Sequence, residues 1–341
     1  MKQKKVTFAD IAAYTGFSKT TISRYFNNPD SLTLENQEKI THALDVLGYQ
    51  ENKLAKVLAN GKSEFVGIII PNLYLHYYSE MLNQLLSTYE KYNYKFLVFI
   101  GNNKKEIEEK YIHELMAYKI EGLIVLSNTI SSEELASYKL PVVTIERECD
   151  HVCSVSTDNY LGGVQATSLL IRNKCDVILH INSILPDTLP TYGRIRGFED
   201  ICNEHHVVHE LIQRNLGNTY QETLTQLKNI FNEIEEKYPS QKKGVFLAND
   251  TYASMFLNLI FQKYGKLPKD YQIVGFDDSP IASEAILPIT TVGQQIEKIA
   301  QTAMELLVLQ MNEMKKRKPT PLKEPVHKQI TPVLIRRDTT E

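Results

Sequence analysis

The sequence has no long apolar segment of the kind that spans a membrane or directs export. Its start, MKQKKVTFAD, lacks the apolar core of a signal peptide. No run of about 18 apolar residues occurs that could cross a bilayer. The four cysteines, at positions 149, 153, 175 and 202, form neither a CxxC pair nor a dense framework. We therefore expect a cytoplasmic protein whose thiols are reduced.

Sequence signals of catalysis and of metal binding are missing as well. We find no glycine-rich phosphate loop, no nucleophile elbow for a Ser-His-Asp triad and no complete set of metal ligands. Carboxylates such as Glu146, Asp277 and Asp278 could in principle serve acid–base chemistry on a sugar, which keeps a sugar-acting enzyme as an alternative. We expect a protein that is not an enzyme and that uses no metal and no cofactor.

Charge is distributed unevenly along the 341 residues, which are enough for two or more domains. The whole chain carries a net charge of −3. Residues 1–62 contain nine Lys and Arg against six Asp and Glu, a net charge of +3, and the remainder carries −6. A small basic head on an acidic body indicates that the head meets a polyanion.

Three short helices are predicted in this head. Thr7 and Asp10 form a capping signal for the first helix, and Gly16 permits a tight turn after it. Ser18 is expected to cap the second helix. A third helix is predicted over 33–48, where apolar residues recur at helical spacing between a threonine cap and a glycine stop. This arrangement is typical of a helix-turn-helix head.

The second helix, SKTTISRYFNN, is unusually polar. Ile22 and Phe26 are four residues apart and can pack inward together. The side chains left to point outward are those of Lys19, Thr20, Ser23, Arg24 and Asn27. Arginine can hold guanine O6 and N7 with two hydrogen bonds, and hydroxyl side chains reach bases or phosphates. A helix that reads the DNA major groove is therefore predicted, with an ordinary solvated helix as the alternative.

Residues 52–63, NKLAKVLANGKS, predict a helix of about two turns, which is too short to be stable in isolation. The head motif T-x-x-D-[IV]-A-x-x-x-G-x-S-x-x-T-[IV]-S-R-x-x-N, this segment and the following FVGIIIP resemble the lactose-repressor (LacI-type) family of bacterial transcription regulators. The resemblance implies that the short helix pairs with its twofold mate and that Leu58 enters the minor groove as a wedge. The DNA-binding residues that follow are Thr7, Ser18, Lys19, Thr20, Thr21, Ser23, Arg24, Asn27, Asn52, Ala55 and Leu58.

Apolar runs alternate with amphipathic stretches through the rest of the chain. The amphipathic stretches include 103–118, 160–173, 220–237 and 250–264. The strand-like runs are 65–71, 94–101, 120–127, 141–146, 176–182, 244–249 and 272–277. Such alternation predicts doubly wound parallel sheets in an α/β body behind the all-α head. In the stretch 160–163, which starts a helix, we expect the two glycines to allow close packing rather than to bind phosphate.

The resemblance implies a body of the periplasmic-binding-protein type, with two lobes and a ligand cleft between them. We expect a DNA-binding domain at 1–49, a linker (hinge) helix at 50–62 and an effector-binding and dimerisation domain at 63–341. The N-lobe is expected to hold about 63–159 and 293–324. The C-lobe is expected to hold about 160–292 and 325–341.

Polar residues follow the predicted strands, where ligands bind in such sheets. By resemblance we assign an effector site to Tyr77, Tyr78, Glu146, Arg194, Asn249, Asp277 and Gln294. Sugar hydroxyls can donate to a carboxylate and accept from a guanidinium, and a tyrosine ring can cover a sugar face. Three of these assignments have a stated alternative: a helix start at Asn249 and Asp250 with Asp250 as the N-cap, a turn cap at Asp277 and Asp278, or a salt bridge within a lobe for Arg194.

These observations predict a sequence-specific DNA-binding transcription regulator. We expect a homodimer, without excluding a tetramer, that represses carbohydrate-utilisation genes from a near-palindromic operator. A small sugar or sugar derivative would control it allosterically, and the protein would associate with the nucleoid when bound to DNA. A global regulator controlled by a phosphoprotein partner is the alternative within the same family.

Overall fold

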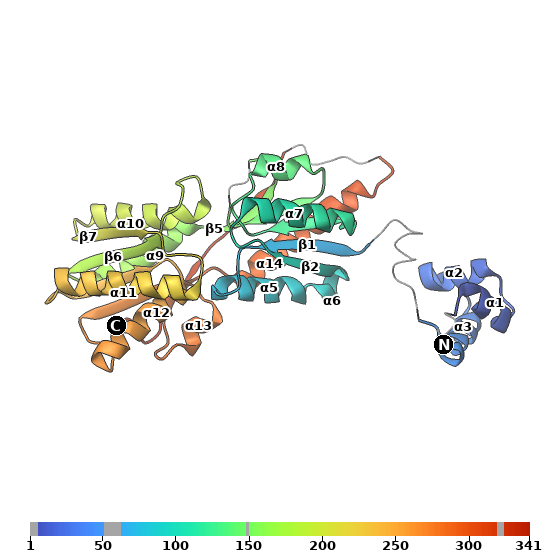
Figure 1. Cartoon of the computed structure of the whole chain (residues 1–341), viewed down its shortest axis with the longest axis horizontal. Helices are drawn as coiled ribbons and strands as arrows, with labels where there is room; N and C mark the ends of the chain where they lie inside the picture. Colours follow the sequence, from blue (N-terminus) through green and yellow to red (C-terminus); the bar gives the residue numbers. More distant parts are fainter. Residues whose placement is uncertain (1–5, 51–62, 148–149, 319–323) are drawn as a thin grey trace. The chain divides into compact units, whose positions relative to one another are not determined.

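The computed structural model describes residues 6–50, 63–147, 150–318 and 324–341. The chain divides into two compact units, Met1–Lys62 and Ser63–Glu341. Figure 1 shows the first as a small helical head and the second as a body of two α/β lobes. Within the described ranges, none of the helices has the length and apolar character needed to cross a membrane.

The head consists of α1 (Phe8–Thr15), α2 (Lys19–Asn27) and α3 (Leu34–Leu47), with a short 3₁₀ turn at Pro29–Ser31. The helices meet at a core of Ile11, Ile22, Ile40 and Ala43. Gly48 ends α3 in the left-handed conformation that glycine adopts without strain. The three predicted helices are confirmed.

The N-lobe is built on a parallel six-stranded sheet in the order β11-β5-β4-β3-β1-β2. Its helices α5, α6 and α14 lie at one face of the sheet, and α7 and α8 lie at the other (Figure 1). The strands are Phe65–Ile70 (β1), Lys95–Ile100 (β2), Gly122–Val125 (β3), Val142–Ile145 (β4), Cys153–Thr157 (β5) and His327–Ile330 (β11). The helices are His76–Ser87 (α5), Tyr89–Tyr92 (α6), Lys105–Ala117 (α7), Ser132–Ser137 (α8) and Ile296–Met314 (α14).

The C-lobe repeats this architecture with the order β12-β10-β9-β8-β6-β7, in which only the β10–β12 pairing is antiparallel. The strands are Val177–Ser183 (β6), His209–Arg214 (β7), Lys243–Leu247 (β8), Tyr271–Asp277 (β9), Thr290–Gly293 (β10) and Val333–Ile335 (β12). The helices are Asn159–Arg172 (α9), Gly193–Glu204 (α10), Tyr220–Lys237 (α11), Asp250–Tyr264 (α12) and Pro280–Glu284 (α13), with a 3₁₀ turn at Pro190–Tyr192.

Both faces of each sheet are buried, which explains why the central strands read as continuous apolar runs. In β1, Ile68 and Ile70 pack towards α5 and α14, whereas Ile69 packs towards α7 and α8. In β8, Val245 and Phe246 divide in the same way between two cores of the C-lobe. The predicted doubly wound α/β body is confirmed.

The chain passes between the lobes three times: from β5 to α9, from β10 to α14 and from β11 to β12. The last passage differs from our expectation that residues 325–341 lie in the C-lobe. Strand β11 pairs in parallel with β5, because His327 lies opposite Ser154, so this segment belongs to the N-lobe sheet. The crossing therefore falls near Thr331, immediately before β12.

Candidate functional site

Helix α2 presents a polar face whose geometry follows from its cap. The Ser18 hydroxyl accepts a hydrogen bond from the Thr21 amide at 3.1 Å, which fixes the start of the helix. Ile22 is fully buried, and the Phe26 ring stacks on Phe8 with centroids 5.1 Å apart. The side chains left exposed are those of Lys19, Thr20, Arg24 and Asn27.

Some of the assigned DNA-binding side chains already have local partners. Ser23 is only half exposed, and the Asn27 amide donates to its carbonyl at 2.9 Å. The Thr21 hydroxyl lies 2.9 Å from that of Ser18. Thr7 is exposed at the start of α1, where its hydroxyl donates to the Asp10 carboxylate at 2.6 Å. Asn52, Ala55 and Leu58 lie outside the described residues.

A second group of polar residues gathers where strands of both lobes end. Glu146 follows β4, Asp277 ends β9 and Gln294 follows β10, and all three are buried. Glu146 and Asp277 adopt φ values of 54° and 115°, in the region that side chains with a Cβ rarely occupy. Such strained backbone tends to collect at functional sites.

A chain of hydrogen bonds connects these residues across the first crossover. The Glu146 carboxylate accepts from the Thr157 amide and, at 2.8 Å, from the Asn159 side chain. The Thr157 hydroxyl donates to the Gln294 side chain at 2.7 Å, and the Gln294 amide donates to Asp277 at 2.5 Å. Residues of the N-lobe, the C-lobe and two crossovers are thus joined in one buried network.

Arg194 is positioned at the centre of this network from helix α10. Its Nε donates to Asn159 at 2.8 Å, and its Nη1 donates to the Ala248 carbonyl at 2.5 Å. The guanidinium lies 3.6 Å above the ring of Phe276 and 3.9 Å from Asp277. This long contact with Asp277 is the salt bridge that the sequence left open.

Burial is the largest cause of the pKa shifts at Asp277, Tyr77 and Tyr78. Burial raises the pKa of Asp277 to about 7, although Arg194 and the bond from Gln294 act in the opposite direction. Burial also raises the pKa of Tyr77 and of Tyr78, whose rings meet edge to face at 5.3 Å. The Tyr77 hydroxyl is buried and has no hydrogen-bond partner among the described residues.

Asn249 is the cap of α12, a role that the sequence alternative gave to Asp250. Its side chain caps α12 by accepting from the Tyr252 amide at 2.8 Å. The expected cap at Asp250 is wrong, because Asp250 is buried and accepts from the Ser279 amide at 2.9 Å and the Thr291 hydroxyl at 2.6 Å. Asp278 points elsewhere, to an ion pair of 2.6 Å with Arg337.

Comparison with known proteins identifies both units. Residues 7–52 match the model for bacterial regulatory proteins of the lacI family, and residues 169–340 match the periplasmic binding protein-like domain. The chain belongs to the lacI family of bacterial regulatory proteins. It is therefore a DNA-binding transcription regulator, as the head motif predicts.

Similar proteins cover almost the whole of this lacI-family chain. The sucrose operon repressor of Streptococcus mutans is 26% identical over 303 residues, which cover 88% of this chain and 91% of the relative. The ribose operon repressor of Halalkalibacterium halodurans is 24% identical, with coverage of 89% and 90%. The lac repressor dimer bound to operator and an anti-inducer has the same fold, with a TM-score of 0.80, 21% identity and 99% of each chain covered.

Sequence reasoning missed Thr157 and Asn159, which link Glu146 to Gln294 and Arg194. Both lie at or just after the end of β5, a polar strand that the apolar runs did not reveal. The stretch STDNYLGG contains both residues, but nothing in it distinguishes these two side chains from helix caps.

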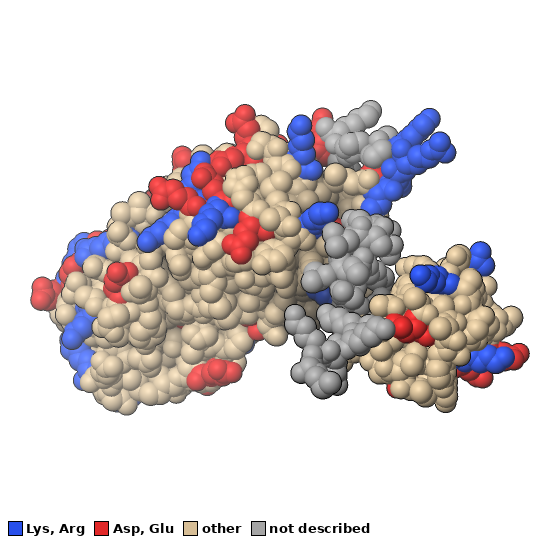
Figure 2. Space-filling view, turned by 45° about the vertical axis from the view of Figure 1, so that its right-hand side comes forward, with Lys and Arg blue, Asp and Glu red and all other residues tan. Residues whose placement is uncertain are grey.

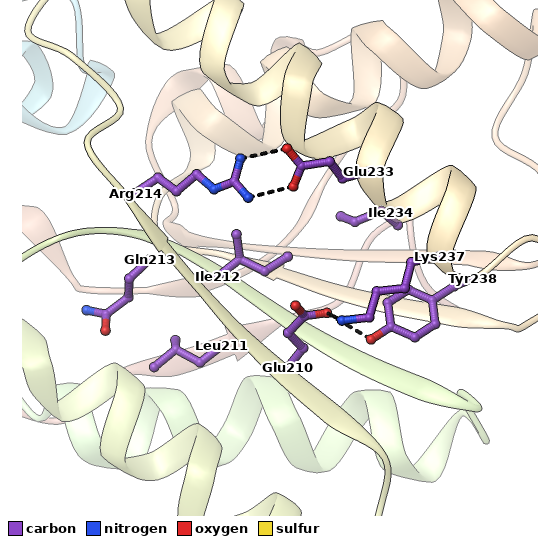
Figure 3. A pocket seen from close by; sticks show the side chains of 9 residues that line it. All are labelled: Glu210, Leu211, Ile212, Gln213, Arg214, Glu233, Ile234, Lys237 and Tyr238. Carbon is purple, nitrogen blue, oxygen red and sulfur yellow. Dashed lines mark hydrogen bonds and ion pairs between the residues drawn. The ribbon is translucent and has the colours of Figure 1, made fainter.

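A groove of about 260 Å³ lies away from this network, between the edge strand β7 and helix α11 (Figure 3). Its charged side chains pair with one another. Arg214 forms two hydrogen bonds with Glu233, at 2.7 and 2.5 Å, and Lys237 donates to Glu210 at 3.0 Å. Since these charges are already satisfied, the groove shows no preference for a charged ligand.

Proposed function

We propose that this lacI-family protein is a homodimeric repressor of carbohydrate-utilisation genes, controlled by a small sugar or sugar derivative bound between its lobes. Two relatives that cover about nine-tenths of the chain are sugar operon repressors. The observation that carries the proposal is the buried network of Glu146, Asn159, Arg194, Asp277 and Gln294 where the two lobes meet.

The network suits a ligand that offers several hydroxyl groups. The Asp277 carboxylate can accept from one hydroxyl, and the Arg194 guanidinium can donate to its neighbour. The unpartnered Tyr77 hydroxyl supplies a further polar contact, and burying it without a partner costs about 1–3 kcal/mol. Glu146 and Asn249 are already engaged in protein hydrogen bonds, so we propose that they act mainly by holding the site in shape.

A thermal-shift screen of sugars, sugar phosphates and sugar acids on the full chain tests the ligand class. Calorimetry then measures the affinity of the best ligand for Arg194→Ala and Asp277→Asn, with Asp278→Asn as the control, since Asp278 pairs with Arg337 instead. We expect each of the first two changes to weaken binding about 5- to 100-fold, from the cost of buried groups left unpaired. Unchanged affinity in both would place the ligand elsewhere, and chemical turnover of the ligand would favour an enzyme.

For DNA, we propose that Lys19, Thr20 and Arg24 read base edges from the exposed face of α2 in each half of a near-palindromic operator. The operator can be selected from a random duplex pool with the wild-type protein. Arg24→Ala should then cost about 1–3 kcal/mol and relax the preference at one base pair per half-site. Lys39→Ala removes the same charge from α3, where Lys39 pairs with Glu35, and serves as the control.

A gel-shift series in which Arg24→Ala retained full affinity and full specificity would overturn this assignment of α2. We further propose that ligand binding changes the closure of the lobes and so the affinity for operator, and that the protein associates with the nucleoid when bound. Adding the selected ligand to the operator complex measures that coupling directly.

A further inference from the structure

The amino ends of the N-lobe strands form an edge of the body that is rich in uncompensated positive charge. Ser63, the first described residue after the linker, enters at this edge, since β1 begins at Phe65. Lys119 and Lys139 precede β3 and β4, and Arg317 and Lys318 follow α14. These four cations are exposed and form no ion pair within the described ranges, and we call them the basic edge.

Among the described residues, nearby carboxylates do not neutralise the basic edge, because they already pair with other lysines. Glu64 pairs with Lys95 at 2.9 Å, Glu121 pairs with Lys315, and Glu313 pairs with Lys316. Glu324, just before β11, offsets at most one of the four charges. Figure 2 shows Lys and Arg side chains projecting together from one end of the body. This positive group stands out because residues 63–341 carry a net charge of −6.

The basic edge is tied to the point where the linker joins the body. The Ser63 hydroxyl donates to the Lys119 carbonyl at 2.5 Å, and the Glu64 amide donates to the Glu121 carboxylate at 2.9 Å. The Glu121 carboxylate also forms an ion pair with Lys315, which shortly precedes Arg317 and Lys318 in the chain. Glu64, just before β1, and Lys315, just after α14, therefore share one anchoring side chain.

The linker also limits how far this edge can be from DNA held by the head. The twelve residues 51–62 span at most about 40 Å when fully extended and less in any folded form. Duplex DNA carries one negative charge per ~1.7 Å of helix axis. A duplex held by the head therefore presents many phosphates within the distance that the linker can span.

We propose that the basic edge binds the phosphate backbone of the duplex that the head has bound. The body, and not only the head, would then contribute to DNA affinity. The ligand class is the DNA backbone, and the interaction is independent of base sequence because Lys and Arg neutralise phosphates. The proposal goes beyond the reading of bases by α2 and needs no effector.

The test compares two double variants of the full chain on the duplex selected by wild-type protein, with long flanks of mixed sequence. Arg317→Ala with Lys318→Ala removes two charges from the basic edge. Lys228→Ala with Lys266→Ala removes two exposed charges from the C-lobe and is the control. The affinity of each is measured as a function of salt concentration.

The slope of log affinity against log salt should become shallower by about 0.9 for each phosphate that the variant no longer neutralises, which is up to about 3.6 for a dimer in which four charges are removed. Reversal of the charges with Arg317→Glu and Lys318→Glu should lower affinity further. A slope equal to that of the control, or reduced affinity with an unchanged slope, would overturn the proposal. If Arg24→Ala still weakens binding in that case, the assignment of α2 stands and only the role of the body in DNA binding falls.

Discussion

At the scale of single residues, Asp277 holds a carboxylate at the junction of the lobes whose pKa burial raises to about 7. A sugar hydroxyl that donates to this group stabilises its charged form, so the pKa must fall in the complex and binding must release a proton. Ligand affinity should therefore rise with pH up to about 7 and level off above it.

Calorimetry between pH 5.5 and 8 measures this dependence, and repeating it in buffers of different ionisation enthalpy counts the protons released. Asp277→Asn should bind more weakly and should lose the pH dependence over that range. If the variant keeps the wild-type pH profile, another group titrates with the ligand and Asp277 does not contact it.

The buried side chain of His180 should make the protein less stable in acid. Its ring is fully buried and stacks on Phe246 at 4.3 Å, and burial lowers its pKa from 6.5 to about 3. Between these values the unfolded chain binds more protons than the folded chain, so stability falls as pH falls. From pH 6.5 to 5 the loss from this group should be about 2 kcal/mol.

Denaturant titrations at the two pH values should detect this loss in wild type and a smaller loss in His180→Gln. His209→Gln is the control, because His209 is only half buried in the edge strand β7. Equal losses in wild type and His180→Gln would mean that other groups set the acid sensitivity.

At the scale of secondary-structure elements, α9 and α10 approach each other through glycine. A Cβ on Gly163 would lie 2.4 Å from the carbonyl oxygen of Arg194, and one on Gly197 would lie 2.4 Å from the carbonyl oxygen of Tyr160. Both obstacles are backbone atoms, which cannot rotate away. The sequence interpretation that the glycine at 163 serves packing is confirmed, and the close approach places Arg194 in its network.

Gly163→Ala should therefore push α10 outward and reduce the free energy of unfolding by about 1–3 kcal/mol, the usual cost of overpacking. Because Arg194 moves with α10, ligand affinity should fall as well. Ser168→Ala on the same helix is the control, since its side chain is half exposed. A Gly163→Ala protein with wild-type stability would show that the two helices separate at little cost.

At the scale of the whole body, direct contacts supplement the three crossovers between lobes. The His76 amide of α5 donates to the Thr251 hydroxyl of α12 at 3.0 Å, and the His76 ring contacts the same oxygen. In a second contact between the lobes, the Asn103 side-chain amide donates to the Asn218 side-chain oxygen at 3.2 Å. These bonds hold the lobes together in the arrangement that we propose binds the ligand.

Thr251→Val keeps the side-chain shape and removes the shared oxygen. The loss of about 1 kcal/mol from this arrangement of the lobes should lower ligand affinity about 5-fold in calorimetry. Thr225→Val, on the exposed face of α11, is the matched control. Wild-type affinity in the Thr251 variant would show that this hydrogen bond does not report on lobe closure.

Features set within a few residues were determined by the sequence itself. The caps at Ser18 and Thr33 and the stop at Gly48 follow from local hydrogen bonding, and the structure confirms all three. The seven apolar runs correspond to β1, β2, β3, β4, β6, β8 and β9. All of these strands except the edge strand β2 are almost wholly buried, and strands buried on both faces are mostly apolar.

The remaining strands, β5, β7, β10, β11 and β12, were settled only by tertiary structure. They are short or polar and gain stability from neighbours distant in the chain, as β11 does from β5. The same holds for the partners of the site. That Arg194 meets Asn159 and Asp277 depends on how the crossovers and the α9–α10 contact bring separate segments together. Local periodicity carries no information about distances between segments far apart in the chain. Residue types therefore predicted which side chains form the site but not how they hydrogen-bond.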